Sequence, residues 1–397
     1  MNNPRLISIL VVLFVAGCTP LPTTIHPVAS LTPSLQNTTL PITTLNPEFT
    51  PTTTSGSKFV RQCLQLADQE TALKGVMSGT ILYYHVPPNE RFILKDVQTG
   101  IEYELPKSKS SSWADYPQIS PNGKMLALME WVYNDQNIEI NNTLWIFDVR
   151  ANLLGKISFD RSGLSKVRWL DNERLIVETE TYGTLLIVNP FTGEKRTISN
   201  ELPGLDVQSG QGASAWRVEY SSDLEWAAYL YITDEGDGSR AIMVRDVVKN
   251  QDIWHSTGGD GGKPVWSPDG HEVAVVSIGD GQLYLVNRSG QVTPVLSSGP
   301  PHKASSPSWS PNGRFIVFWN ADSLVVYDRR LNQMIDLCIP GYGSPIPPPV
   351  NWSPDSQQFI VYGYSTHPIL VNWEEKVAYK IQGTTDNAIL GWMNSLP

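Results

Sequence analysis

The chain has 397 residues, of which 41% are hydrophobic and 17% are charged, compared with about 25% charged residues in average globular proteins. It contains 30 Gly, 30 Pro and 13 Trp. This mixture is rich in strand and turn formers and poor in helix formers, which excludes a helical bundle, a coiled coil and a disordered chain. The 29 basic and 39 acidic residues give a net charge of -10. We therefore expect no nucleic-acid partner, because binding to phosphates needs clustered Lys and Arg.

The N-terminus has the features of an export signal. Arg5 precedes an apolar run over residues 6–16, which would rise only about 16 Å as a helix. That is about half of the ~30 Å hydrocarbon core of a bilayer, so a cleaved secretory signal fits and a lasting transmembrane span does not. The run ends in V-A-G-C at residues 15–18, which resembles the lipobox of bacterial lipoproteins.

That resemblance implies a lipoprotein signal peptide over residues 1–17 and a lipidated Cys18 at the mature N-terminus. Two or more acyl chains give stable membrane attachment, so we expect the protein in the cell envelope, anchored to the extracytoplasmic side of a membrane. The alternative is an ordinary cleaved signal in which Cys18 has no special role. Residues 18–57 are rich in Thr, Pro and Ser, with Glu48 as the single charge, and predict an extended tether.

A turn motif recurs through the rest of the chain. Pro presets φ at the second position of a tight turn, and Asp or Asn followed by Gly suits the positions after it. Each copy leads into an apolar strand. The clear copies read I-S-P-N-G at 119–123, W-S-P-D-G at 266–270, W-S-P-N-G at 309–313 and W-S-P-D-S at 352–356, and weaker copies begin at Trp169 and Tyr220.

A second repeat runs in phase with the turn motif. Seven times, an apolar strand ends in Asp or Asn and is followed by a turn and a short apolar strand. The intervals of 41 to 57 residues match the size of one four-stranded propeller blade. The seven residues are Asp96, Asp148, Asn189, Asp246, Asn287, Asp328 and Asn372.

The W-S-P-D-G turn before an apolar strand resembles the TolB-type, WD40-like propeller repeat, often called the PD40 repeat. The resemblance extends over about residues 76–397 and implies an all-β fold with four antiparallel strands in each blade. Seven segments precede the turn motifs as candidate innermost strands, and the last of them, at 389–393, has no blade after it. Three strands within residues 80–105 lack an innermost strand. We therefore predict a seven-bladed β-propeller whose C-terminal strand completes the first blade, with six blades as the alternative.

The repeated aromatic and polar residues are expected to have structural roles. The Asp or Asn that ends each middle strand should hydrogen-bond to its own turn rather than bind a metal ion. The Trp that opens each motif should pack between neighbouring sheets rather than stack on a ligand. These tryptophans are Trp169, Trp266, Trp309, Trp352 and Trp392.

Three cysteines are present. If Cys18 is lipidated, Cys63 and Cys338 remain as an even pair in an exported protein. Cys63 lies in residues 58–75, which we expect to pack on the propeller as an N-terminal segment, and Cys338 follows an outer strand of the sixth blade. We expect a disulfide that staples this segment across the ring. The alternative is two unpaired, buried thiols.

Sequence motifs for catalysis are not found. No G-x-S-x-G elbow occurs, and a zinc motif that begins at His271 has Val275 where its second His is needed. We assign no catalytic residue, no metal ligand and no cofactor site. Carboxylates are plentiful, but their spacing in the sequence does not reveal which of them meet across a ring.

The leading hypothesis is a membrane-anchored, non-enzymatic and monomeric interaction module that binds a protein or a glycan. The alternative is an envelope glycan hydrolase or lyase that uses carboxylates in the channel. Loops that lead into the innermost strands should line one mouth of the channel, where a rigid scaffold often carries function. The candidate ligand-face residues in these loops are Trp113, Asp115, Asp260, His302 and Tyr342.

Overall fold

All residues that the structure describes belong to one unit of the chain, residues 51–397. The structure is a computed structural model. No helix in the described part of the chain has the length and hydropathy needed to cross a bilayer. The described residues are 57–67, 74–85, 91–106, 111–113, 117–133, 136, 139–159, 164–179, 184–199, 214–232, 240–255, 263–277, 281–295, 304–321, 323–340, 350–362, 368–373, 375–381 and 387–395.

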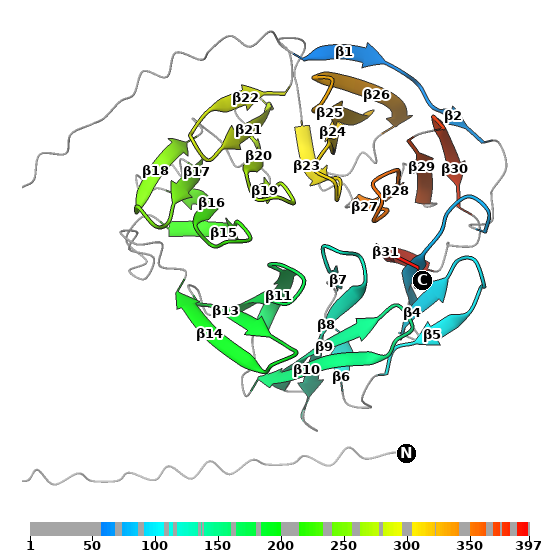
Figure 1. Ribbon diagram of the computed structural model, residues 1–397, viewed down its shortest axis with the longest axis vertical. Helices are drawn as coiled ribbons and strands as arrows, with labels where there is room; N and C mark the ends of the chain where they lie inside the picture. Colours follow the sequence, from blue (N-terminus) through cyan, green and yellow to red (C-terminus); the bar gives the residue numbers. More distant parts are fainter. Residues whose placement is uncertain are drawn as a thin grey trace, which may run out of the picture. The chain divides into compact units, whose positions relative to one another are not determined.

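Seven β-sheets are arranged around a centre as the blades of a propeller (Figure 1). The fold is therefore all-β with seven blades, and the alternative of six blades is wrong. Each blade is an antiparallel sheet of four strands, except that the inner strand of blade 2 is split into two short pieces.

From the centre outward, the strands of blades 1 to 4 are as follows. Blade 1 has β31 (Asn387–Met393), β3 (Thr80–His85), β4 (Arg91–Asp96) and β5 (Glu102–Glu104); blade 2 has β6 (Ser111–Trp113) with β7 (Gln118–Ile119), then β8 (Met125–Tyr133), β9 (Glu139–Asp148) and β10 (Leu153–Phe159); blade 3 has β11 (Leu164–Trp169), β12 (Leu175–Thr179), β13 (Thr184–Asn189) and β14 (Glu194–Ser199); blade 4 has β15 (Ser214–Tyr220), β16 (Trp226–Ile232), β17 (Arg240–Asp246) and β18 (Gln251–His255).

The remaining three blades follow the same order. Blade 5 has β19 (Val265–Trp266), β20 (Glu272–Val276), β21 (Leu283–Asn287) and β22 (Val292–Pro294); blade 6 has β23 (Ala304–Trp309), β24 (Phe315–Asn320), β25 (Ser323–Asp328) and β26 (Gln333–Pro340); blade 7 has β27 (Asn351–Trp352), β28 (Gln358–Tyr362), β29 (Pro368–Asn372) and β30 (Val377–Lys380).

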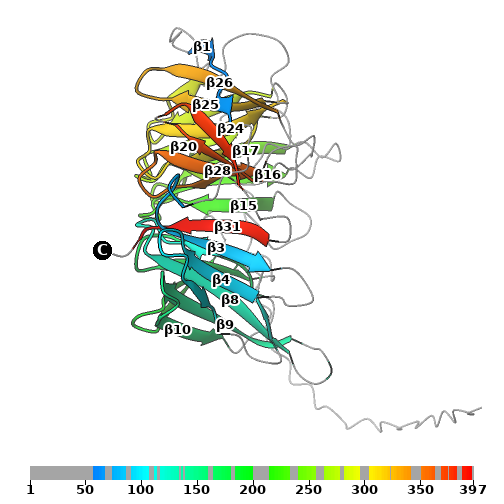
Figure 2. The ribbon, with the colours of Figure 1, turned by 90° about the vertical axis from the view of Figure 1, so that its right-hand side faces the viewer.

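The C-terminal strand closes the ring, as the sequence predicted. β31 pairs antiparallel with β3, with Leu82 opposite Gly391 and Ile81 opposite Trp392. Figure 2 shows these two strands side by side. Blade 1 thus takes its innermost strand from the end of the chain and its other three strands from residues 80–104. A closed ring leaves no unpaired inner edge at the join.

The hydrophobic core lies between the blades. Side chains alternate along a strand, so Phe315, Val317 and Trp319 of β24 pack toward blade 7, while Ile316 and Phe318 pack toward blade 5. The buried residues form seven clusters, and each cluster joins two neighbouring blades. This is why the middle strands read as continuous apolar runs. A blade buries its faces only when it has a neighbour on each side.

Two short strands before the ring extend the outer edges of blades 6 and 7. β1 (Lys58–Arg61) pairs in parallel with β26, and β2 (Gln65–Leu66) pairs in parallel with β30. These outer strands need cover because Met334, Ile335 and Leu337 of β26 are buried apolar residues. By contrast, the outer strand of blade 1 reads Glu-Tyr-Glu and that of blade 3 begins Glu-Lys-Arg, and charged side chains protect an open edge.

A disulfide joins Cys63, between β1 and β2, to Cys338 in β26, with the two Cα atoms 4.7 Å apart. The bond lies at the outer rim of blade 6 because β26 is the outermost of that blade's own four strands. The prediction of a staple across the ring is therefore wrong. The bond instead fixes the N-terminal segment along the outer edge of blade 6, which the segment already covers.

Candidate functional site

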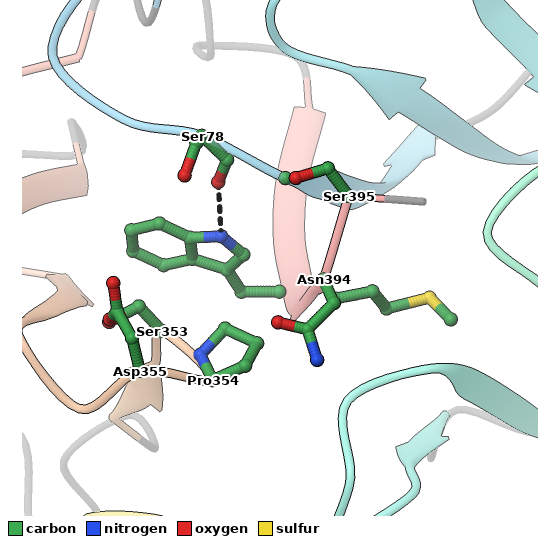
Figure 3. Close-up of a pocket in the computed structure, with 9 residues that line it drawn as sticks. Ser78, Ser353, Pro354, Asp355, Asn394 and Ser395 are labelled. Carbon is green, nitrogen blue, oxygen red and sulfur yellow. Dashed lines mark hydrogen bonds between the residues drawn. The ribbon is translucent and has the colours of Figure 1, made fainter. Parts of the chain in front are cut away.

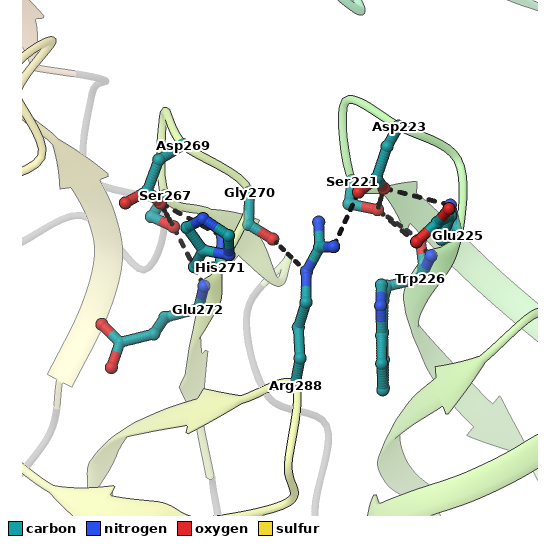
Figure 4. Close-up of polar contacts among 10 residues, drawn as sticks. All are labelled: Ser221, Asp223, Glu225, Trp226, Ser267, Asp269, Gly270, His271, Glu272 and Arg288. Carbon is teal, nitrogen blue, oxygen red and sulfur yellow. Dashed lines mark hydrogen bonds and ion pairs between the residues drawn. The ribbon is translucent and has the colours of Figure 1, made fainter.

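The repeated turn motif forms a small hydrogen-bonded unit between the two inner strands of a blade. In blade 5, the Ser267 hydroxyl donates to the Asp269 carboxylate at 2.5 Å and accepts from the Glu272 N–H at 3.0 Å, while Asp269 accepts from the His271 N–H at 3.1 Å (Figure 4). The same three bonds occur at Ser120, Ser221, Ser310 and Ser353.

The last position of the motif requires a left-handed backbone. Gly270 and Gly313 have φ of +68°, and Gly123 has φ of +69°. Glycine adopts this conformation without steric cost, which explains the Gly of the W-S-P-D-G letters. Ser356 and Leu224 hold the same position in blades 7 and 4 with φ of +65° and +66°, so the turn tolerates other residues where the rest of the motif holds it.

The Asp or Asn that ends each middle strand binds its own turn, as predicted. Asp148 Oδ1 accepts the N–H groups of Arg150 and Asn152 at 2.8 and 2.9 Å, and Asn287 Oδ1 accepts from Ser289 and Gln291 at 3.0 Å each. All seven residues accept a backbone N–H from two to four positions farther along the chain. Their side chains therefore stabilise turns.

The motif tryptophans pack between blades, also as predicted. The Trp169 indole donates to the Gln118 carbonyl at 3.0 Å, Trp266 donates to Glu219 at 2.8 Å, and Trp309 donates to Val265 at 2.9 Å. In each case the acceptor lies on the innermost strand of the preceding blade. Trp309, Trp352 and Trp392 are buried. These rings fix the angle between successive blades.

We define the turn face as the face of the ring that carries the turns after the first (innermost) and the third strand of each blade. Two arginines connect neighbouring blades on this face. Arg288 of blade 5 donates to the Gly270 carbonyl at 2.8 Å and pairs with Asp223 of blade 4 at 2.6 Å (Figure 4). Burial raises the pKa of Asp223, but hydrogen bonds from Ser221 and Arg288 outweigh it and hold this pKa below its usual value. Arg329 of blade 6 repeats the arrangement, with the Gly313 carbonyl and the Glu272 carboxylate as partners.

A small polar hollow of about 40 Å³ lies where blade 7 meets blade 1 (Figure 3). The two inner strands of blade 1, β31 and β3, come from opposite ends of the chain, so no turn joins them. The hollow lies beside the ends of these strands, where the turn motif lies in other blades. The Trp392 indole donates to the Ser78 carbonyl at 2.8 Å. A space of this size suits one or two water molecules rather than a sugar or a peptide. The other lining residues are Gly79, Ser353, Pro354, Asp355, Met393, Asn394 and Ser395.

Charged side chains meet along the innermost strands of blades 3, 4 and 5. Arg168 of β11 donates to Glu219 of β15 at 2.5 Å, and Lys263, just before β19, reaches the other oxygen of the same carboxylate at 2.7 Å. Arg168 also donates to the Val218 carbonyl at 3.3 Å. We call Arg168, Glu219 and Lys263 the inner charged network. It is the strongest candidate for a functional site in the described residues.

Sequence reasoning missed this network. The three residues are about 50 positions apart, so their proximity follows only once the blades are in register. The sequence did contain a signal for the pair of Arg168 and Glu219. Each of these residues stands immediately before the motif aromatic of its blade, so alignment of the repeats places opposite charges at the same position of neighbouring blades. Among the described residues, no group of three or more His, Cys, Asp or Glu side chains is placed to hold a metal ion.

Of the five residues predicted from the sequence to contact a ligand, four lie outside the described residues. Asp115, Asp260, His302 and Tyr342 lie outside the described residues, as does Cys18. Trp113 is the last residue of β6, which is the first of the two pieces that form the inner strand of blade 2. Its backbone pairs with Glu130 of β8. These assignments stay predictions.

Solved structures share this fold. Two oligogalacturonate lyases, one in complex with manganese and one from Vibrio parahaemolyticus, match with TM-scores of 0.52 and 0.50 at 12% and 13% identity, each over 77% of this chain and 86% of theirs. A periplasmic gluconolactonase from Pseudomonas aeruginosa matches with a TM-score of 0.47 at 14% identity, over 81% of this chain and 99% of its own. At such identities the likeness to the two lyases establishes the propeller fold alone. No protein-family model and no curated protein matches the sequence.

Proposed function

We propose that this protein is a non-enzymatic interaction module that presents one mouth of a rigid propeller to a ligand. The observation that carries this proposal is the inner charged network. Glu219 is only 12% exposed and has a cation on each carboxylate oxygen, so the three residues form a fixed pattern of charge, which suits recognition.

The rigidity of the scaffold supports the same proposal. Seven inter-blade clusters and a closed first blade hold the innermost strands in place, and a disulfide fixes the outer rim of blade 6. Binding to a preorganised surface loses less conformational entropy than binding to a mobile one. The segments that join adjacent blades leave from the ends of these strands, so the scaffold fixes where they begin.

We further propose that the propeller is a lipoprotein of the cell envelope. The support is in the sequence: the apolar run over residues 6–16, the letters V-A-G-C that end at Cys18 and the Thr- and Pro-rich residues 18–57. A lipid on Cys18 would attach the chain to a membrane, and the tether would give the ring reach. Likewise, the W-S-P-D-G repeat supports assignment of the blades to the PD40 type.

Two measurements test these proposals. Metabolic labelling with a palmitate analogue should label the full-length protein and should fail for Cys18→Ser; labelling of both would contradict lipidation at Cys18. For function, the immobilised full-length protein should retain a defined envelope component that elutes intact. Cleavage of envelope polysaccharide by the protein, with no retained component, would favour a hydrolase or lyase instead.

A further inference from the structure

A column of basic residues accompanies the inner charged network. The third residue before the motif aromatic is Lys166 in blade 3, Arg217 in blade 4 and Lys263 in blade 5. The corresponding positions of blades 6 and 1 hold Ser306 and Ile389. We call Lys166, in β11, and Lys263, just before β19, the basic arc, since they hold this repeat position at the inner edges of blades 3 and 5. Basic residues thus recur at this repeat position in three successive blades of a chain whose net charge is -10.

The lysines of this arc are accessible. The Lys166 side chain is 58% exposed and lies 3.8 Å from Glu178 of the next strand, a spacing typical of a weak surface pair. The Lys263 side chain is 55% exposed, although its ammonium group contacts Glu219. Each ammonium can therefore take a further anionic partner without unfolding the strand that carries it.

The backbone positions these residues by local irregularities. The pairing of β11 with β12 shifts register between Leu164 and Lys166, and that of β15 with β16 shifts between Trp216 and Glu219. Such bulges redirect side chains and are frequent beside binding sites. In blade 3 the shift ends at Lys166, and in blade 4 it ends at Glu219.

The contacts of Glu219 show that the basic side chains at this level bind a carboxylate. Its carboxylate has a guanidinium at 2.5 Å on one oxygen and an ammonium at 2.7 Å on the other, which is a charge-assisted geometry for an acidic side chain. A carboxylate from another molecule would find ammonium donors at Lys166 and at the exposed part of Lys263.

We propose that the basic arc, together with Arg168, binds the carboxylates of an acidic polypeptide segment at the inner wall of blades 3 to 5. This assignment rests on the proposed interaction function and specifies its ligand as a protein segment rich in Asp or Glu. Glu219 acts within it as an internal competitor, because it occupies donors that the ligand would use.

The test is binding of a fluorescent peptide of alternating Glu and Ser to the full-length protein, measured by anisotropy. We expect Lys166→Gln/Lys263→Gln to weaken binding by about tenfold or more, and binding to weaken as salt rises. The matched control Lys58→Gln/Lys124→Gln removes the same charge from exposed sites elsewhere and should leave affinity within about twofold of the parent protein. Glu219→Gln should tighten binding by about threefold, since it frees two donors, whereas a purely structural Glu219 would give no gain in affinity.

Three results would overturn this assignment. One is equal peptide affinity in the Lys166→Gln/Lys263→Gln variant, with circular dichroism showing an intact fold. Another is binding of an oligouronate but not of the peptide, which would identify a glycan site. The third is no binding of either probe. If an envelope component is retained equally by the parent and by this variant, the interaction function stands and the location of its site is wrong.

Discussion

Gly391 lies directly opposite Leu82 in blade 1, although these residues belong to the last and the first strand of that blade in the sequence. A Cβ on Gly391 would lie 2.4 Å from the tip of the Ile119 side chain of blade 2, so a larger residue at this position would require Ile119 to move. The two clusters that contain blade 1 include Met393 and Trp392 from the same strand. Loss of β31 would therefore expose the core on both sides of the blade.

Substitution of the motif glycines should separate backbone strain from steric conflict. Gly313→Ala should cost about 1–2 kcal/mol, because φ is +68° and a Cβ would meet nothing closer than 3.8 Å. Gly123→Ala has the same φ within a degree, but its Cβ would lie 2.9 Å from both Asn394 and Pro354. We expect a larger loss of unfolding free energy for Gly123→Ala in denaturant titrations. Equal losses of unfolding free energy in the two variants would show that Asn394 and Pro354 do not pack against Gly123 as closely as the structure has them.

The motif serine should matter more than its size suggests. Ser310 is fully buried, and its hydroxyl donates to Asn312 at 2.8 Å and accepts from the Phe315 N–H at 2.9 Å. Ser310→Ala leaves that N–H without its side-chain partner, which should cost about 1–3 kcal/mol in unfolding free energy. Ser289→Ala, at an exposed turn where the hydroxyl bonds to Asn287, is the matched control and should change stability by less than about 0.5 kcal/mol.

The repeats made most of the fold predictable. A turn motif and a strand-ending Asp or Asn that recur in phase define the blades. The unmatched strand at the C-terminus and the three strands at the front that lack an innermost strand predict the closure of the first blade. The structure confirms seven blades and the roles of Trp266 and Asp148. The strands β1 and β2 could not be predicted, because four and two residues are too few to carry a periodic pattern. They form because the apolar outer edges of blades 6 and 7 are available to them.

The candidate site was less predictable than the fold. Arg168, Glu219 and Lys263 stand in different repeats, and charge at one repeat position is informative only after the repeats are aligned by the motif aromatic. The loops chosen from sequence lie mostly outside the described residues. Arguments from loops alone thus miss a site built on the innermost strands.

The disulfide should stabilise the rim without being needed for the ring. Cys63→Ser/Cys338→Ser should lower the unfolding free energy by about 2–4 kcal/mol, because the bond closes a long loop, while β31 stays paired with β3. Thermal unfolding with and without reductant checks this: reductant should lower the Tm of the parent protein and leave that of the double variant unchanged. A cooperative fold lost altogether in the variant would show that the bond is required for closure.

Asp223 should make stability depend on acid pH. Its pKa is held below the usual value in the folded protein by hydrogen bonds from Ser221 and Arg288 that outweigh burial. A carboxylate with a depressed pKa contributes stability above its unfolded pKa of about 3.9, and that contribution is lost as pH falls through the folded pKa. Asp223→Asn should therefore be less stable than the parent protein at neutral pH, and the difference should shrink below about pH 4. A difference independent of pH would contradict this role for the Arg288 pair.

The closed first blade is tested most directly by a cross-link between its inner strands. His85 and Asn387 are backbone partners in the pairing of β3 with β31, so His85→Cys/Asn387→Cys should form a disulfide under oxidising conditions, seen by mass spectrometry of a non-reduced digest. Glu104→Cys/Asn387→Cys is the control, because β5 lies at the opposite edge of the same sheet, and both of its new thiols should remain free. If the His85 and Asn387 variant also keeps two free thiols, the C-terminal strand does not complete blade 1 and the ring described here is wrong.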